Sequence, residues 1–287
     1  MHRKILTIAL AIVIGAGLAS IQALTQQQAP PALTMDKIKD DLYEIVGDGG
    51  NVAVLVTNEG VLLIDDKFQQ DHDQILEKVK SVTNQPIKYV INTHYHEDHS
   101  GGNGKMLPGV DIISTANSRK NIMEHKQSNA SPNVVPARIT FNDETSVFIG
   151  GKEVRARYFG RGHTNGDAVI YFPADRTIHT GDLMAGTSPL IDYNGGGSLI
   201  EWTKTLDAAM KQLDFDTVIP GHGNVTNKAG LMTYRNNVEK LRNRVTGLIR
   251  EGKTQDDIAR VMTTEYGWQP NSLQQQWSVP GFMKELK

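Results

Sequence analysis

Short apolar segments separated by turns dominate the first part of the chain. Leu42–Val46, Val52–Thr57 and Val61–Asp65 are rich in valine, leucine and isoleucine. Gly47–Asn51 and Asn58–Gly60 lie between them and carry the glycine and asparagine that favour turns. These segments are therefore predicted to form a meander of β-strands.

Helical spacing first appears at Asp71–Val82, where Ile75, Leu76 and Val79 fall on one face of a helix. Ser118–His125 is also predicted to be helical. Further strands are expected at Ile87–Ile91, Val110–Ser114, Arg138–Phe141, Ser146–Ile149, Val154–Phe159, Ala168–Phe172, Thr177–Thr180 and Asp216–Ile219, with a polar loop at Ser128–Pro136.

The second half of the chain carries the longer helices. Ser198 and Glu201 have the spacing of a capping box, which predicts a helix start there. Ala229–Arg250 and Thr254–Thr264 are two further predicted helices. Strands interrupted by helices predict an α/β fold, namely an αββα sandwich of two mixed β-sheets with helices on the outer faces.

The first residues are not expected to belong to this fold. Arg3 and Lys4 precede an uncharged apolar run from Ile5 to about Ala19. This pattern predicts a signal peptide at residues 1–23, with cleavage after Ala23. The alternative is an uncleaved membrane anchor, but the run is shorter than the roughly 20 residues that span a bilayer. We expect a linker at residues 24–34, a single domain at 35–287, and a periplasmic or secreted protein.

The composition narrows the chemistry of any functional site. The 287 residues include no cysteine, which excludes disulfides, thiolate metal ligands and a cysteine nucleophile. A bound metal must therefore be held by imidazole and carboxylate groups. The formal net charge of -2 argues against nucleic acid as a partner. We expect a small-molecule substrate and, once the leader is removed, no stable membrane partner.

The strongest functional signal follows the predicted strand Ile87–Ile91 directly. It reads Asn-Thr-His-Tyr-His-Glu-Asp-His-Ser-Gly-Gly over residues 92–102. In an extended segment His94 and His96 would point to the same side, while Asp98 and His99 could face a second position. A polar surface loop is the alternative. Gathering these side chains in a buried site without a cation would be costly, so we favour a metal site.

Three later segments add ligand types at the ends of predicted strands. His163 lies in a glycine-flanked turn, Asp182 follows Thr177–Thr180, and His222 follows Asp216–Ile219. Each would be weak evidence alone, because a single histidine or aspartate in a turn is usually solvated. Together with the first segment they supply seven ligands, enough for two ions that share one carboxylate.

The chain resembles the metallo-β-lactamase-fold hydrolase superfamily over nearly all of its length beyond the leader. The resemblance lies in HxHxDH at His94–His99, GHTxGD at Gly162–Asp167, TGD at Thr180–Asp182 and GHG at Gly221–Gly223.

The resemblance implies specific roles for these side chains. His94, His96 and His163 would hold one zinc ion. Asp98, His99 and His222 would hold a second. Asp182 would bridge both, and Asp65 would lie next to the ligands without binding metal itself.

Two zinc ions imply a hydrolytic mechanism in which water is activated near neutral pH, with Asp98 as the catalytic residue that orients it. Iron or manganese are alternatives at such a site. Lactamases of this superfamily that use a cysteine ligand carry it where Asp182 stands, and have a lysine where this chain has Ala185. The aspartate looks more like glyoxalase-II-type thioesterases and phosphodiesterases.

We therefore predict an exported di-zinc hydrolase that opens an ester, lactone or β-lactam carbonyl. A thioesterase or phosphodiesterase of the same superfamily is the alternative. A non-catalytic metal-binding or relay protein, and a di-iron redox protein, are hypotheses from other classes.

The other polar and aromatic candidates are not predicted to bind metal. Arg161 could hold an anionic substrate group but could equally be solvated. His179 is expected in a supporting or surface position. Trp202, Trp268 and Trp277 are expected to pack in the core or against helices rather than to stack on substrate.

Overall fold

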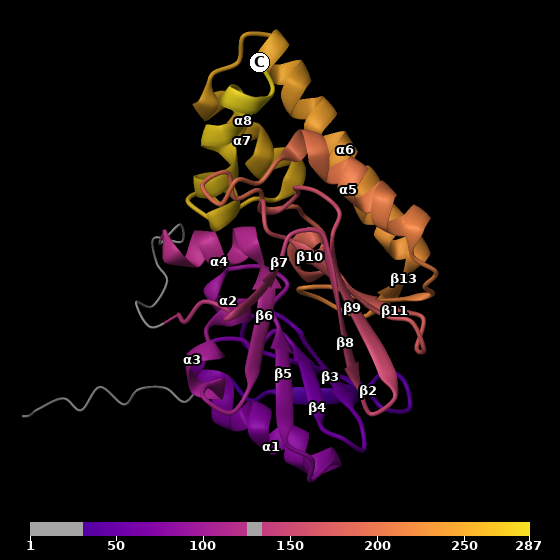
Figure 1. Ribbon diagram of the computed structural model, residues 1–287. Coiled ribbons are helices and arrows are strands. Elements are labelled where there is room, and N and C mark those ends of the chain that lie inside the picture. The colour runs from indigo at the N-terminus through magenta and orange to yellow at the C-terminus, as the bar shows by residue number, and fades with distance from the viewer. Residues whose placement is uncertain (1–30, 125–133) are drawn as a thin grey trace, which may run out of the picture.

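The computed structural model describes residues 31–124 and 134–287. The predicted leader, most of the predicted linker and His125 lie outside these ranges. Two β-sheets pack face to face, and helices cover the outer face of each (Figure 1). The predicted αββα sandwich is therefore confirmed.

The first sheet contains seven strands in sequence order. Its first four strands pair antiparallel, whereas β4 to β7 run parallel because longer crossovers that include helices connect them. Its strands are β1 (Thr34–Lys37), β2 (Leu42–Val46), β3 (Val52–Val56), β4 (Val61–Ile64), β5 (Ile87–Ile91), β6 (Asp111–Thr115) and β7 (Ile139–Phe141).

The second sheet contains six strands in the order β13-β12-β11-β10-β9-β8. Only β11 and β12 are parallel, because helix α5 (Leu199–Gln212) lies between them in the chain. Its strands are β8 (Glu144–Ile149), β9 (Lys152–Tyr158), β10 (Ala168–Phe172), β11 (Thr177–His179), β12 (Thr217–Ile219) and β13 (Thr226–Asn227).

Alternation along the strands explains why the sheets stack. In β4, Leu62 and Ile64 point into the core between the two sheets, while Val61 and Leu63 point outward and pack with helix α1 (His72–Val82). Because both faces of the strand are buried, it reads as a continuous apolar run rather than an alternating one.

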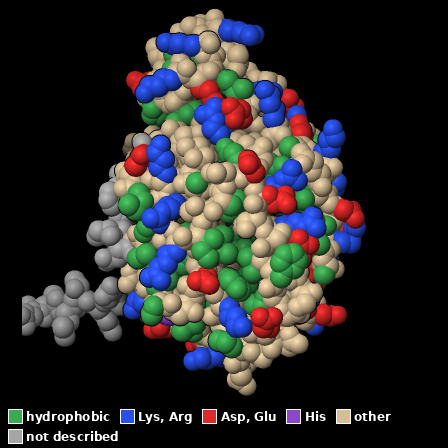
Figure 2. All heavy atoms as spheres, viewed as in Figure 1, with side chains coloured by type: hydrophobic (Ala, Val, Ile, Leu, Met, Phe, Trp, Pro, Cys, Tyr) green, Lys and Arg blue, Asp and Glu red, His purple; other side chains and the backbone are tan. Residues whose placement is uncertain are grey.

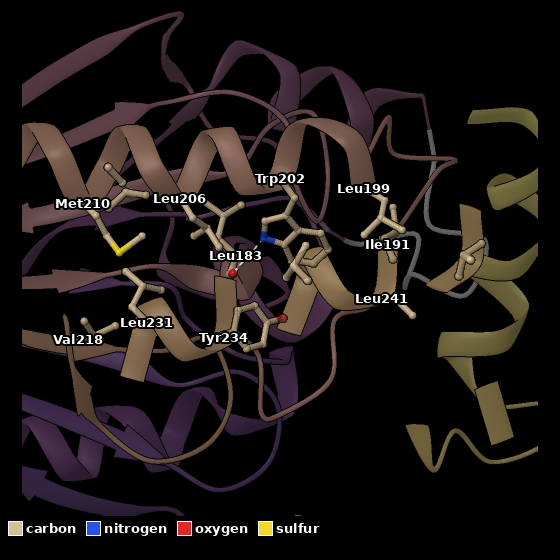
Figure 3. Close-up of a cluster of buried hydrophobic side chains, with 14 of the residues drawn as sticks. Leu183, Ile191, Leu199, Trp202, Leu206, Met210, Val218, Leu231, Tyr234 and Leu241 are labelled. Atoms are coloured by element: carbon tan, nitrogen blue, oxygen red, sulfur yellow. Dashed lines mark hydrogen bonds between the residues drawn. The ribbon is translucent and has the colours of Figure 1, made fainter. Parts of the chain in front are cut away.

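The outer face of the second sheet is covered by the C-terminal half of the chain. Trp202 of α5 is fully buried there, and its Nε1 donates to the carbonyl oxygen of Leu183 at 3.1 Å (Figure 3). This confirms the expected packing role of Trp202. Helices α5 and α6 (Lys228–Arg250) lie along this face. Helices α7 (Gln255–Tyr266) and α8 (Val279–Glu285) pack against the same apolar cluster at the end of the sandwich, with a π-helical turn at Gln274–Ser278 before α8 (Figure 1).

The helices against the first sheet are shorter. They are α1, α2 (Glu97–Ser100), α3 (Asn103–Met106) and α4 (Ala116–Met123), with a 3-10 turn at Gln69–Asp71 before α1. Helix α4 begins two residues earlier than predicted because the Thr115 side chain accepts the Ser118 N–H and caps it.

The predicted capping box of α5 forms only in half. Ser198 Oγ accepts the N–H of Glu201 at 3.1 Å, but the Glu201 carboxylate pairs with Arg161 instead of returning to Ser198. At α7 both halves form, between Thr254 and Asp257.

The surface seen in Figure 2 intersperses basic and acidic side chains, with no large area of one sign on that face. In residues 31–124 and 134–287, no helix combines the length and the apolar character needed to cross a membrane.

Candidate metal centre

Loops from both sheets meet at one edge of the sandwich and bring all seven predicted ligands together. The segment from His94 to His99 follows β5, while the other three ligands follow β9, β11 and β12. Their ligand atoms fall into three overlapping groups, each within 4.8 Å: His94, His96 and His163; His94, His99 and Asp182; Asp98, His99 and His222. The expectation that strand ends would gather them is confirmed.

We call His94, His96 and His163 the three-histidine group. His96 Nδ1 lies 3.1 Å from His94 Nε2 and 2.9 Å from His163 Nε2. Burial, with neighbouring imidazoles, lowers the pKa of His94 well below its usual range and that of His163 to about 4. Both rings are therefore neutral at neutral pH, as metal ligands must be.

We call Asp98, His99 and His222 the mixed group. His222 Nε2 lies 3.1 Å from Asp98 Oδ2 and 3.3 Å from His99 Nε2. Burial opposes ionisation of Asp98, but His99 and His222 outweigh it and lower its pKa to about 2. The group brings the ligand atoms of one carboxylate and two histidine rings within 4.8 Å of one another. Asp98 and His99 lie in the short helix α2, which the sequence pattern did not predict.

Asp182 faces both groups. Its Oδ1 lies 3.2 Å from His99 Nε2 and 3.5 Å from His222 Nε2, and its Oδ2 lies 3.7 Å from His163 Nε2. Within the described residues, the buried Oδ1 has no hydrogen-bond partner. An unpartnered carboxylate oxygen among converging ring nitrogens fits a pair of metal ions that share this side chain.

In three of the ligand rings, the nitrogen that points away from the other ligands lies within hydrogen-bond distance of an oxygen atom. His99 Nδ1 lies 2.7 Å from Asp65 Oδ2, His96 Nε2 lies 2.9 Å from Asp192 Oδ2, and His163 Nδ1 lies 2.7 Å from a carbonyl oxygen. Such bonds fix the tautomer and leave the facing nitrogen with a free lone pair.

Asp65 thus lies where the resemblance implied, against a ligand ring. Sequence reasoning missed Asp192, because it lies in no motif and reaches His96 only through the fold.

His179 is not at the surface, one of the two positions expected for it. It is fully buried. Its Nε2 donates to the carbonyl oxygen of Asn51 at 3.1 Å, and its Nδ1 accepts the N–H of Gly181 at 3.1 Å. His179 therefore holds the turn that carries Asp182, which is a supporting role.

A cavity of about 660 Å³ lies beside the three-histidine group, lined by the loop after Asp192 and by the C-terminal segment. The Trp277 ring lines it and lies 5.1 Å from the His96 ring. Trp277 is only partly buried, so it does not lie in the core, one of the two packing positions expected for it. Arg161 also lines the cavity, but it is paired with Glu201.

Comparisons with known proteins agree with this geometry. Residues 45–222 match the metallo-beta-lactamase superfamily. A type 2 metallo-beta-lactamase from Elizabethkingia meningoseptica is 28% identical over 231 residues, covering 74% of this chain and 86% of that protein.

Solved structures share the fold. A metallo-beta-lactamase from Pontibacter korlensis gives a TM-score of 0.64 at 21% identity, covering 72% of this chain and 99% of the other. The metallo-beta-lactamase FIM-1 from Pseudomonas aeruginosa, in its mono-zinc form, gives 0.63 at 20% identity, covering 74% and 97%.

Proposed function

Because the chain belongs to the metallo-β-lactamase superfamily and is a metal-dependent hydrolase, we propose that it is an exported di-zinc enzyme that opens an ester, lactone or β-lactam carbonyl. The observation that carries this proposal is the shared position of Asp182, whose two oxygens face the three-histidine group and the mixed group separately.

Each group would hold one zinc ion. The three-histidine group offers three neutral nitrogen ligands, and the mixed group adds a carboxylate. Imidazole-rich sites suit zinc, although iron or manganese would also accept the mixed group. Bound zinc supplies Lewis-acid chemistry, in which water ionises near neutral pH and a carbonyl oxygen is polarised.

The chain's own residues position the reactants. The Asp98 side chain is 23% exposed, so water can reach its carboxylate. As a carboxylate it would accept a hydrogen bond from the attacking water and direct the oxygen lone pair at the substrate. The cavity beside His96 has a volume typical of sites for small molecules, and we place the body of the substrate there.

The test is hydrolysis by the zinc-loaded protein of a chromogenic cephalosporin, a lactone, an ester, a thioester and a phosphodiester. Turnover should vanish with a chelator and in His94→Ala. It should persist in His72→Ala, a histidine outside the seven ligands. Turnover that survives His94→Ala would overturn the site assignment. Turnover of the thioester or phosphodiester alone would move the function to those alternatives.

Zinc content tests the number of ions separately. Two equivalents per chain support the di-zinc proposal, and one would reject it. Stoichiometric zinc with no turnover of any substrate class would favour a metal-binding or relay protein instead.

Export rests on the basic start, the apolar run and Ala23. Expression of the full chain in a bacterium, followed by N-terminal sequencing of the periplasmic fraction, should yield a mature protein that begins at Leu24. Retention in the membrane with an intact N-terminus would identify an anchor instead.

A further inference from the structure

Lys67 is a buried lysine that takes no part in the proposed reaction. Its side chain is fully buried, and its φ of 57° lies in the left-handed region that residues other than glycine rarely adopt. It comes two residues after Asp65, which contacts His99. Lysine is almost never fully buried unless its ammonium is partnered, so its partners indicate its role.

The ammonium of Lys67 bonds the loop between β2 and β3. Its Nζ donates to the carbonyl oxygen of Asp48 at 2.9 Å and to that of Gly50 at 2.5 Å. Burial lowers the pKa of Lys67 to about 8, while Asp71 and other nearby carboxylates limit that fall. The ammonium therefore remains mostly charged at neutral pH.

Gly50 connects the loop that Lys67 holds to the mixed group. Its N–H donates to the carbonyl oxygen of Asp98 at 3.0 Å. A Cβ at this position would lie 2.1 Å from Cε1 of His99, so the backbone can pass the ring only as glycine. The loop thus contacts two members of the mixed group directly.

Asn51, the next residue, contacts the segment that carries His222, the third member of the mixed group. Asn51 Nδ2 donates to the carbonyl oxygens of Pro220 and Gly223, at 3.1 and 2.8 Å, on either side of His222. The Asn51 N–H also donates to the carbonyl oxygen of Gly221 at 2.7 Å. One short loop therefore joins the segments that carry all three ligands.

We propose that Lys67 is a positioning residue that holds loop 48–51 and thereby sets the geometry of the mixed group. Among residues 31–124 and 134–287, loop 48–51 makes no hydrogen bond to a side chain of the three-histidine group, so we expect that group not to depend on Lys67. This inference rests on the proposed metal site.

The sign of the effect separates positioning from simple electrostatics. A positive charge near Asp98 repels a metal cation bound there, so by Coulomb's law alone the removal of Lys67 would tighten metal binding. If Lys67 acts by holding the loop, its removal weakens binding. Removal of supporting contacts behind metal ligands typically lowers affinity ten- to hundredfold, and we expect about tenfold here because Lys67 acts through a loop.

The experiment measures zinc affinity by competition with a chromophoric chelator in two backgrounds of the full chain. His163→Ala leaves only the mixed group complete, and His222→Ala leaves only the three-histidine group complete. Lys67→Met should weaken zinc about tenfold in the first background and leave the second unchanged. Tighter binding in the first, no change in it, or an equal loss in both would overturn the proposal.

Two further sets of variants test whether misfolding or lost stability explains the result. Lys67→Arg and Lys67→Gln carry the same test if Lys67→Met does not fold, with a smaller selective loss expected for arginine because it keeps the charge and the donors. Val79→Ala, a core substitution in α1, controls for lost stability and should leave both affinities unchanged.

The zinc measurements distinguish a failure of this inference from a failure of the proposed function. A parent chain that binds fewer than two zinc ions would contradict the proposed function. A parent that binds two, with no selective loss on changing Lys67, would contradict only the role of the lysine.

Discussion

Asp192→Asn should weaken metal binding at the three-histidine group. Asp192 Oδ2 lies 2.9 Å from His96 Nε2, and the two side chains are only 4% and 5% exposed, so solvent does not screen the contact. The carboxylate holds the His96 ring with Nδ1 toward the other two histidines. Loss of such partners lowers metal affinity roughly ten- to hundredfold, which corresponds to about 1.4–2.7 kcal/mol. We expect a loss in that range.

The assay is zinc competition in the His222→Ala background, where only the three-histidine group is complete. Tyr95→Phe is the matched control, because the Tyr95 hydroxyl donates to the same Oδ2 of Asp192 and its removal leaves the carboxylate in place. Tyr95→Phe should change the affinity far less than Asp192→Asn. Equal losses in the two variants, or an unchanged affinity in Asp192→Asn, would refute the reasoning, since the ring would then not depend on the carboxylate.

Three further predictions concern the loop, a buried acid and the cavity. Gly50→Ala places a Cβ 2.1 Å from the His99 ring, so zinc stoichiometry should fall from two to one; a retained second equivalent would contradict this. Burial, then Asp36, raises the pKa of Glu44 to about 7, so the folded state binds its proton more tightly than the unfolded state. Stability should therefore fall as pH rises from about 4.5 to about 7, and urea unfolding of Glu44→Gln should lack that fall. Trp277→Ala should raise KM for ring-bearing substrates with little change in kcat, whereas a selective loss of kcat would argue against a binding role.

Much of the fold could be predicted from local patterns. Strand β4 was placed correctly because its side chains are apolar on both faces, and α7 because Thr254 caps it. The short helix at Glu97–Ser100 was missed, since four residues carry too little periodicity to distinguish a helical turn from a bend. The C-terminal helix α8 was not predicted either.

The sequence by itself determined the residue types of the site and their places at strand ends, because histidine and aspartate at close spacing after buried strands form a local pattern. The tertiary structure alone decided how these side chains are supported. Asp192 meets His96 across 96 positions of the chain, and Lys67 meets Gly50 across 17. A single aspartate or lysine has no local pattern that reveals its partner, because the partner is set by which segments the two sheets bring together.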